Sequence, residues 1–342
     1  MSAPADPLAF DFGITFKPAS ERVRGERRRR SEMTAHRLEF GIPFLDDCLR
    51  SILPNDLVLL GAASGVGKTE LAKGIAVVNA HRGKVVHFLA LEAEEDEIER
   101  RAKYAVLVKL ALAAGEDMKG VNYTDWYLGN LDGLLGKYEE PAEREMGGVY
   151  ANLKTYYKGR RFSHDDISRL FLAVQSETDL LVLDHLHYVD VDDENENRGL
   201  KQLTKTIRDV NLSMGKPIVM VVHLRKRDQR ARTIVPDLDS IHGTSDVPKI
   251  ATRVILMAPA RCLPSKVPHL AHTFIHVPKD RMSGATGHVA LCVYHRSMRR
   301  YSSVYTLGYE TEAGDFEPID LEHKPAWAKG HVPLTQNIGG LS

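Results

Sequence analysis

Short apolar runs alternate along this chain with segments in which apolar residues recur at helical spacing. Five of these runs are rich in Val, Ile and Leu, at residues 57–60, 85–91, 180–183, 218–222 and 253–257. Runs of this kind are typical of strands that are covered on both faces, as in parallel sheets. Helical patterns lie between most of them. Together they predict an α/β fold with a mostly parallel central sheet and helices on both faces.

The rest of the chain carries weaker patterns. Residues 273–277 and 288–294 predict a C-terminal antiparallel hairpin. Residues 115–162 are expected to be helical, with a stripe of packing residues at Trp126, Leu128, Leu131, Leu134 and Leu135. Residues 313–342 are rich in Pro and Gly, which predicts a loose C-terminal tail.

Residues 1–36 predict a flexible basic arm ahead of a domain that we place at residues 37–312. Four arginines stand at residues 27–30, and three phenylalanines precede them at Phe10, Phe12 and Phe16. A basic run of this kind binds nucleic acid or a partner, or it forms a solvated helix. A third interpretation is an arm that docks on a neighbouring subunit through the phenylalanines.

Small residues and glycines follow the first apolar run and lead directly into a helical pattern. In order they are Ala62, Ala63, Ser64, Gly65, Val66, Gly67, Lys68 and Thr69. Strand, glycine-rich loop and helix in this order are typical of a phosphate-binding loop, in which backbone N–H groups and the helix N-terminus face the anion. We expect Lys68 to reach the β- and γ-phosphates and the Thr69 hydroxyl to bind Mg²⁺. Ala62 stands where the usual motif has Gly, so its φ must be negative.

Three ionisable residues stand at the ends of later apolar runs, namely Glu92, Asp184 and His223. Ligands of open α/β sheets bind beyond the carboxyl ends of the strands, so we expect these residues beside the phosphate loop. Asp184 would hold the Mg²⁺ through water. His223 would donate a hydrogen bond to the γ-phosphate. The alternative is an ordinary polar residue at each strand end.

A long polar stretch at residues 224–246 is basic in its first half. Its side chains and backbone N–H groups are candidates for contacts with nucleic-acid phosphates. The candidate residues are Arg225, Lys226, Arg230, Arg232, His242, Gly243 and Thr244. Long loops inside compact domains are usually functional or disordered, so the alternative is a solvated loop.

Two basic residues, Lys279 and Arg281, stand at the expected tip of the C-terminal hairpin. Residues two apart in an extended chain project on the same side. The ammonium and guanidinium groups are therefore expected to meet a phosphate that another subunit carries.

Composition gives no electrostatic bias to the whole protein. The 342 residues include 46 Lys and Arg and 46 Asp and Glu, so a contact with nucleic acid would need a local basic patch. Cys48, Cys262 and Cys292 form no CxxC pair, which argues against a zinc ribbon or disulfide framework and fits a reducing compartment. No apolar run approaches the ~20 residues that span a bilayer, and no signal core follows the N-terminus. We expect a cytoplasmic protein without a membrane partner.

Taken in order along the chain, the motifs described above resemble the RecA-like motor domain of hexameric replicative helicases of the DnaB type. The resemblance is strongest to the branch of phage helicase–primases and their mitochondrial relative. It spans about residues 40–310 and rests on residues 41–49, 62–69, 88–92, 181–188, 221–226, 241–245 and 279–281. It implies a RecA-like P-loop NTPase core, and Ala at the first loop position is common in that family.

The resemblance also implies roles for the candidate residues. Glu92 matches the glutamate that orients or deprotonates the attacking water, and His223 matches the γ-phosphate sensor. Lys279 and Arg281 match the pair that acts on the ATP of the neighbouring subunit. The segment before Gly243 matches the one that grips single-stranded DNA, although the family often has Arg where this chain has a serine at 240.

The implied function is that of an ATP-dependent replicative DNA helicase. Such a protein forms a homo-oligomer, a hexameric ring, which binds ATP and Mg²⁺ and translocates 5′–3′ on single-stranded DNA. A primase or a loader protein would be a further partner. The alternative is a RecA-like ATPase switch or assembly factor that oligomerises on DNA or a partner protein without unwinding. The zero net charge favours the switch, and the basic loop favours the motor.

Overall fold

The computed structural model describes residues 18–63, 65–160, 162–190, 196–225, 233–243, 246–284 and 286–334. The chain divides into two compact units, Met1–Arg37 and Leu38–Ser342. The first unit contains helices α1 (Ala19–Arg24) and α2 (Glu26–Ala35). On α2, Arg28 pairs with Glu32 and Arg30 with Glu26, both at the surface. The three phenylalanines expected as anchors lie outside the described residues.

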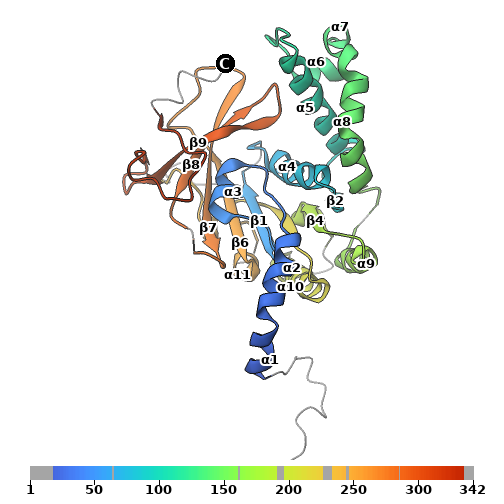
Figure 1. Cartoon of the computed structure of the whole chain (residues 1–342), viewed down its shortest axis with the longest axis vertical. Coiled ribbons are helices and arrows are strands. Elements are labelled where there is room, and N and C mark those ends of the chain that lie inside the picture. Colours follow the sequence, from blue (N-terminus) through green and yellow to red (C-terminus); the bar gives the residue numbers. More distant parts are fainter. Residues whose placement is uncertain are drawn as a thin grey trace, which may run out of the picture. The chain divides into compact units, whose positions relative to one another are not determined.

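The second unit is built on a ten-stranded sheet with the order β10-β9-β8-β7-β6-β1-β5-β4-β2-β3 (Figure 1). The six strands from β6 to β3 run parallel, and β7 to β10 extend the sheet in antiparallel fashion. The strands are β1 (Leu57–Ala62), β2 (Val86–Ala90), β3 (Leu153–Tyr157), β4 (Leu180–Asp184), β5 (Ile218–His223), β6 (Arg253–Pro259), β7 (Leu270–Asp280), β8 (Val289–His295), β9 (Arg300–Glu310) and β10 (Phe316–Pro318).

Helices cover both faces of the sheet, as expected. One face packs on α3 (Pro43–Leu49), α4 (Lys68–His81), α5 (Glu97–Ala113) and α8 (Glu139–Asn152). The other packs on α9 (His164–Val174), α10 (Glu196–Met214) and α11 (Asp246–Ile250). Alternation within β1 shows why two cores form: Val58 and Leu60 join the first, and Leu57 and Leu59 join the second.

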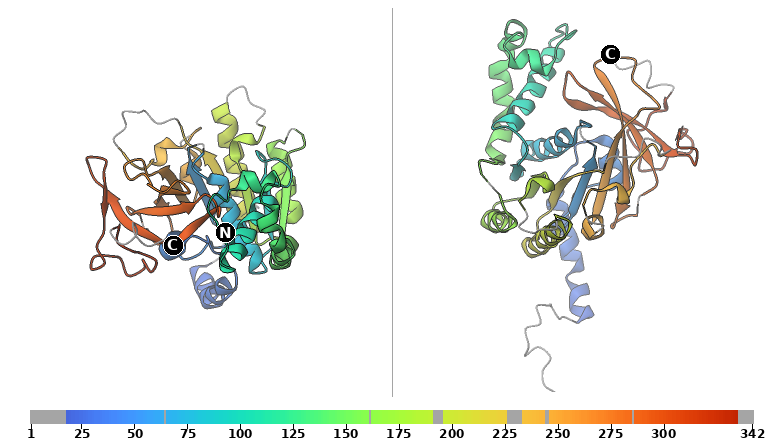
Figure 2. Two further views of the ribbon diagram at one scale, coloured as in Figure 1. Left: turned by 90° about the horizontal axis from the view of Figure 1, so that it is seen from above. Right: turned by 180° about the vertical axis from the view of Figure 1, so that it is seen from behind.

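Two short helices, α6 (Tyr123–Tyr127) and α7 (Asp132–Leu135), pack on α5 around Tyr104. Figure 2 shows α5 to α8 in teal and green at the end of the sheet away from the orange and red antiparallel strands. Within the described residues, 3₁₀ helices lie in connections at Gly136–Tyr138, Leu186–Tyr188 and Leu238–Ser240. No helix in the described ranges is long and apolar enough to cross a membrane.

The structure corrects the expectation for residues 115–162, because this segment is not helical throughout. It ends in β3, an edge strand that pairs in parallel with β2 and is mostly half-exposed. An edge strand needs no continuous apolar run, so it left no strong hydropathy signal. Leu128 was also wrong as a packing residue, since it is 66% exposed.

The C-terminal segment is packed as far as Leu334, so the expectation of a loose tail from residue 313 is wrong for the described part. Strand β10 pairs with β9, and Ala328 is fully buried. The His331 ring is buried too, and its Nδ1 accepts a hydrogen bond from the Leu307 N–H at 3.0 Å. The expected antiparallel hairpin is confirmed as β7 and β8, which pair from Leu270 with His295 to His276 with Val289.

Candidate active site

The loop between β1 and α4 has the backbone of an anion cradle. Gly65 and Gly67 have φ of +78° and +100°, values at which a Cβ is strained, and Gly67 is the N-cap of α4. Ala62 is the last residue of β1 and is not among the residues with positive φ, so alanine is tolerated there. Ser64 lies outside the described residues.

A cavity of about 1020 Å³ opens above this loop. The phosphate loop contributes Gly65, Val66, Gly67, Lys68 and Thr69 to its lining, and the ends of β2, β4 and β5 contribute Glu92, Asp184 and His223. Ala62 and Ala63 are not in the lining. The strand-end residues therefore lie beside the loop, because β1 is flanked by β5 and β5 by β4.

The Lys68 ammonium lies 3.3 Å from Nδ1 of His223 and 3.5 Å from the Ala63 carbonyl oxygen. Burial lowers the pKa of Lys68, while Glu92 and Asp184 oppose this shift. Burial, and then the charge of Lys68, lower the pKa of His223. A neutral His223 that accepts from Lys68 at Nδ1 carries its proton on Nε2, so Nε2 can donate to an anion in the cavity.

Asp184 has the environment of a cation ligand. It is 2% exposed, its Oδ1 has no hydrogen-bond partner, and the Thr69 side chain bonds to its carboxylate. Burial raises the pKa of Asp184 to about 6 despite the Thr69 hydrogen bond. A buried carboxylate oxygen without a partner, next to a hydroxyl, fits Mg²⁺, which prefers oxygen ligands. Thr69 and Asp184 are thus the residues that would hold the ion.

The raised pKa of Asp184 predicts that Asp184→Asn stabilises the nucleotide-free protein. A carboxyl group whose pKa is raised on folding contributes stability that is lost as the pH rises through the folded-state pKa, here about 6. An amide does not ionise, so Asp184→Asn loses no stability as the pH rises through this range. We expect a gain in the free energy of unfolding of about 3 kcal/mol at pH 8 and about half of that at pH 5. Urea unfolding with EDTA present measures both; an equal gain at the two pH values would contradict this origin.

His185, which the sequence did not single out, contacts Glu92. Its Nδ1 accepts from the His187 N–H at 3.3 Å, and its Nε2 lies 2.9 Å from Glu92 Oε2 without the alignment of a hydrogen bond. Burial, then His223 and His187, lower the pKa of His185 to about 3, so the ring is neutral and its proton sits on Nε2. Its position directly after Asp184 was the available sequence signal.

Glu92, His185 and His223 also bring three metal-ligand atoms within 4.8 Å of one another. Two of the three are imidazole nitrogens, which suit zinc and other transition metals better than Mg²⁺. This cluster therefore does not compete with Thr69 and Asp184 as the place for Mg²⁺.

Comparison with known proteins shows the family of the chain and its fold. The AAA domain family matches residues 24–229. The chain belongs to this family. No curated protein matches the chain by sequence. One similar solved structure is an ATPase domain that is 13% identical, with a TM-score of 0.68 over 84% of this chain and 99% of that one.

A second similar structure is that of a DnaB-like replicative helicase, 14% identical, with a TM-score of 0.63. The likeness covers 77% of this chain and 61% of the helicase chain. At such low identity the likeness establishes the fold. The expected RecA-like fold of DnaB-type motor domains is therefore confirmed, and the chain is a P-loop NTPase of that fold.

A second group of residues that the sequence did not reveal surrounds Glu70, on the first turn of α4. Its carboxylate pairs with Lys73 at 2.7 Å, with Arg101 at 3.3 Å and with Arg299. Burial alone would raise the pKa of Glu70, but Lys73 and Arg299 outweigh it and lower the pKa to about 2. Arg101 and Arg299 also line the cavity, so Glu70 fixes two cations at its wall.

The expected DNA-binding segment lies directly beside the end of β5. The His242 N–H donates to the His223 carbonyl oxygen at 2.9 Å, and Arg225 Nη2 donates to the Gly243 carbonyl oxygen at 3.0 Å. Gly243 is buried with a φ of +97°, and a Cβ there would lie 3.0 Å from Leu200 Cδ1. Lys226, Arg230, Arg232 and Thr244 lie outside the described residues.

Of the two basic residues, Arg281 lies in the connection between β7 and β8, at the expected hairpin tip, whereas Lys279 lies within β7, and neither lines the cavity. Strand β7 is longer than expected, so Lys279 pairs within the sheet with Val254 of β6. Its ammonium donates to the carbonyl oxygens of Pro248 and Lys249, at 2.7 and 2.9 Å. Arg281 follows β7 and has an exposed side chain. Both residues lie at the amino ends of the parallel strands, opposite the phosphate loop.

Proposed function

We propose that the protein is the motor of a ring-forming DNA helicase, which hydrolyses ATP to translocate on single-stranded DNA and unwind duplex. The 5′–3′ direction and the hexameric ring rest on the DnaB resemblance. One observation carries the proposal: a single cavity gathers Lys68 and Thr69 from the phosphate loop with Glu92, Asp184 and His223 from three strand ends. This set serves phosphoryl transfer to water, in which rate comes from positioning and charge stabilisation.

Each residue has a distinct task in that reaction. Lys68 and the loop N–H groups bind the β- and γ-phosphates, and His223 Nε2 donates to the γ-phosphate. Mg²⁺, when bound, neutralises charge on the phosphate oxygens. Glu92 is 45% exposed at its side chain and can reach a water molecule, and His185 Nε2 lies 2.9 Å from its Oε2. Glu92 then orients that water and accepts its proton.

Arg281 completes the site of the neighbouring subunit. Arg253 pairs in register with Val58, and Met257 pairs with Ala62 at the phosphate-loop end. Arg281 lies beyond Arg253, at the opposite end of β6 from Met257. The strand from Arg253 to Met257 spans about 13 Å, so Arg281 is farther than this from its own phosphate loop. A head-to-tail ring brings this end of one subunit to the cavity of the next. The arginine would then stabilise charge in the transition state, as fingers supplied in trans do.

DNA contact is proposed for the segment around His242 and Gly243 and for the basic stretch that begins at Arg225. The hydrogen bond from His242 to the His223 carbonyl oxygen joins this segment to the γ-phosphate sensor. A change in the phosphate contact of His223 would therefore be felt directly at the DNA-binding segment. The similar DnaB-like helicase is described with its interactions with primase, and we propose a primase or a loader as a further partner.

Glu92→Gln is predicted to separate nucleotide binding from hydrolysis. The amide keeps the shape of the side chain but cannot accept the proton of the attacking water. We expect the kcat for ATP to fall by about 10²–10⁴-fold, with nucleotide affinity unchanged. Single-turnover kinetics and titration with a fluorescent ATP analogue measure the two quantities. Glu95→Gln, which alters an exposed carboxylate of the same loop, is the matched control. A normal kcat in Glu92→Gln would remove the general base from the proposal.

Strand displacement on a forked duplex tests the function itself. We expect single-stranded DNA to stimulate ATP turnover and the fork to be unwound in an ATP-dependent manner. Stimulation without unwinding would favour the second candidate, a RecA-like ATPase switch or assembly factor. The balanced charge of the chain, 46 basic against 46 acidic residues, favours that candidate. If single-stranded DNA caused no stimulation and the fork was not unwound, the DNA-dependent part of the proposal would be overturned.

A further inference from the structure

A buried arginine stands at the start of β6, on the side of the sheet opposite the phosphate loop. Arg253 is 1% exposed and is the largest fully buried side chain of the described residues. A guanidinium is rarely buried without ionised partners, because removing the charge from water is costly. The contacts of Arg253 therefore show which segments of the chain it holds together.

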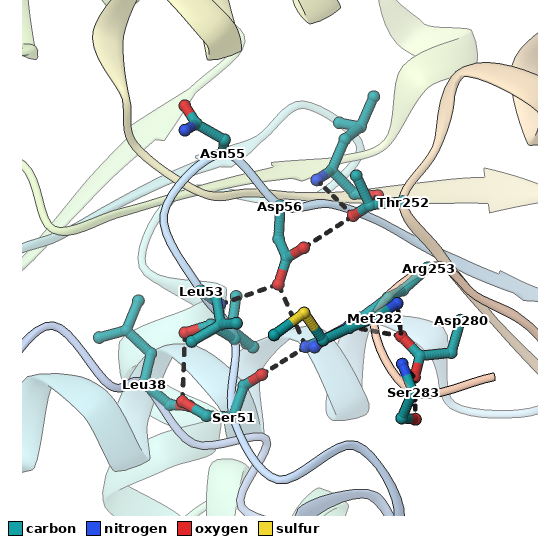
Figure 3. A network of polar contacts seen from close by, with 12 residues as sticks. Leu38, Ser51, Leu53, Asn55, Asp56, Thr252, Arg253, Asp280, Met282 and Ser283 are labelled. Carbon is teal, nitrogen blue, oxygen red and sulfur yellow. Dashed lines mark hydrogen bonds and ion pairs between the residues drawn. The ribbon is translucent and has the colours of Figure 1, made fainter. Parts of the chain in front are cut away.

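Arg253 joins three segments that are distant in sequence (Figure 3). Its Nε donates to Asp280 Oδ1 at 3.1 Å, and its Nη1 lies 3.1 Å from Asp56 Oδ2 and donates to the Ser51 carbonyl oxygen. We call Asp56, Thr252, Arg253, Asp280 and their hydrogen bonds the Arg253 network. It spans the residue before β1, the start of β6 and the end of β7.

At one end of the network, Asp280 shapes the backbone that carries Arg281. Its carboxylate accepts from the Met282 N–H at 3.2 Å, from the Ser283 N–H at 2.9 Å and from the Ser283 hydroxyl. Burial alone would raise the pKa of Asp280, but the Ser283 and Met282 hydrogen bonds and Arg253 outweigh it and lower the pKa, so the group is ionised. The turn after β7 is thus fixed on the carboxylate that Arg253 holds.

Arg281 itself is held by its backbone while its side chain remains exposed. Its N–H donates to the Thr252 carbonyl oxygen at 3.0 Å, and Thr252 directly precedes Arg253. The Thr252 hydroxyl donates to Asp56 Oδ1 at 2.9 Å, and the Thr252 N–H donates to the Leu57 carbonyl oxygen at 2.9 Å. Backbone on both sides of Arg281 is therefore anchored to the residues that begin the phosphate-loop strand.

We propose that Arg253 and Asp280 are positioning residues for Arg281, which they hold in the orientation that reaches the site of the neighbouring subunit. The inference rests on the proposed role of Arg281 as a finger in trans. Neither residue touches nucleotide. They hold the backbone of Arg281 on the rigid, buried Arg253 network. This lowers the conformational entropy that is lost when the flexible Arg281 side chain binds at the site of the neighbouring subunit. The Arg253 network is joined through Asp56 to β1, so Arg281 moves as one body with the phosphate-loop strand of its own subunit.

Asp280→Asn tests this inference with little change in shape. The amide oxygen can still accept from Arg253, but the amide nitrogen cannot accept from Ser283. We expect ATP turnover to fall by about 10–100-fold, with nucleotide affinity unchanged, since the subunit's own cavity is intact. Asp166→Asn is the matched control, because Asp166 also accepts from a serine N–H, a serine hydroxyl and an arginine, but on α9. It should leave turnover unchanged.

Mixed oligomers show whether the loss arises in trans. Asp280→Asn subunits mixed with Lys68→Ala subunits should recover part of the turnover, because an intact finger then faces an intact phosphate loop. A variant that was merely destabilised would not be rescued in this way, so loss without recovery would overturn the inference. If Asp280→Asn had wild-type turnover and Arg281→Ala had lost it, the positioning inference would be overturned, but the proposed role of Arg281 in trans would stand. If Arg281→Ala had normal turnover, the proposed role of Arg281 itself would be wrong.

Ser283→Ala keeps the test available if Asp280→Asn does not fold. It removes one hydrogen bond to Asp280 at an exposed position and leaves the buried ion pair intact. We expect a smaller loss of turnover than in Asp280→Asn, again recovered by Lys68→Ala subunits. Unchanged turnover in Ser283→Ala, together with an unfolded Asp280→Asn, would count against a positioning role and favour a purely structural one.

Discussion

Replacing Lys68 with alanine is expected to reduce ATP turnover by about 10³-fold or more. Lys68 is 8% exposed, and its ammonium lies between His223 and the phosphate loop, in the cavity where the γ-phosphate would lie. Removing a preorganised donor from such a site costs about 10²–10³-fold, and the lost binding of the phosphates adds to it. Steady-state turnover of the purified variant measures the effect. Lys109→Ala, at an exposed ion pair on α5, is the control and should be neutral.

A Lys68→Ala variant that turned over ATP normally would contradict the assignment of the phosphate loop. A folding defect is excluded by thermal unfolding without nucleotide. Lys68 is buried and burial lowers its pKa, so its removal should not destabilise the protein. Loss of turnover with retained stability is therefore the expected pair of results.

Arg281→Ala is expected to have the second large effect, a loss of about 10³–10⁵-fold in turnover, the range known for arginine fingers. Nucleotide affinity should be unchanged, because Arg281 lies at the end of the sheet opposite its own cavity. Mixing Arg281→Ala with Lys68→Ala subunits should restore part of the activity, since some interfaces then join an intact loop to an intact finger. Titrating the ratio of the two variants at constant total protein gives the measurement.

The alternative outcome in that titration is informative. A finger that worked within its own subunit would give no recovery at any ratio, because neither variant then has a complete site. Lys279→Ala separates the two basic residues, since the Lys279 ammonium is bonded to the carbonyl oxygens of Pro248 and Lys249 in its own chain. We expect Lys279→Ala to disturb α11 and to lower turnover less than Arg281→Ala does.

The sequence predicted the parts of the fold that have strong periodicity. Strands β1, β2, β4, β5 and β6 were predicted because each is covered on both faces and so must be apolar throughout. Their parallel order in turn places Glu92, Asp184 and His223 at one edge. The edge strand β3 was missed because only part of it is covered. The packed segment after β9 was missed because Pro and Gly composition does not reveal burial.

The parts of the site that depend on distant pairs could not be predicted. Arg253 begins an apolar run, and nothing local indicates that it is buried against Asp56 and Asp280. Likewise the tautomer of His185 depends on the backbone N–H of His187 and on burial. Lys279 was placed at a hairpin tip because the register of β7 with β6 is set by tertiary pairing, which extends the strand to Asp280.

The most direct test of the motor is an image of the protein assembled with single-stranded DNA and a non-hydrolysable ATP analogue. Electron cryo-microscopy should show a ring in which Arg281 of each subunit points at the phosphates held by Lys68 of the next. The DNA should pass through the centre beside His242 and Gly243. Single subunits, or an assembly with Arg281 facing solvent and DNA outside the centre, would contradict the proposal.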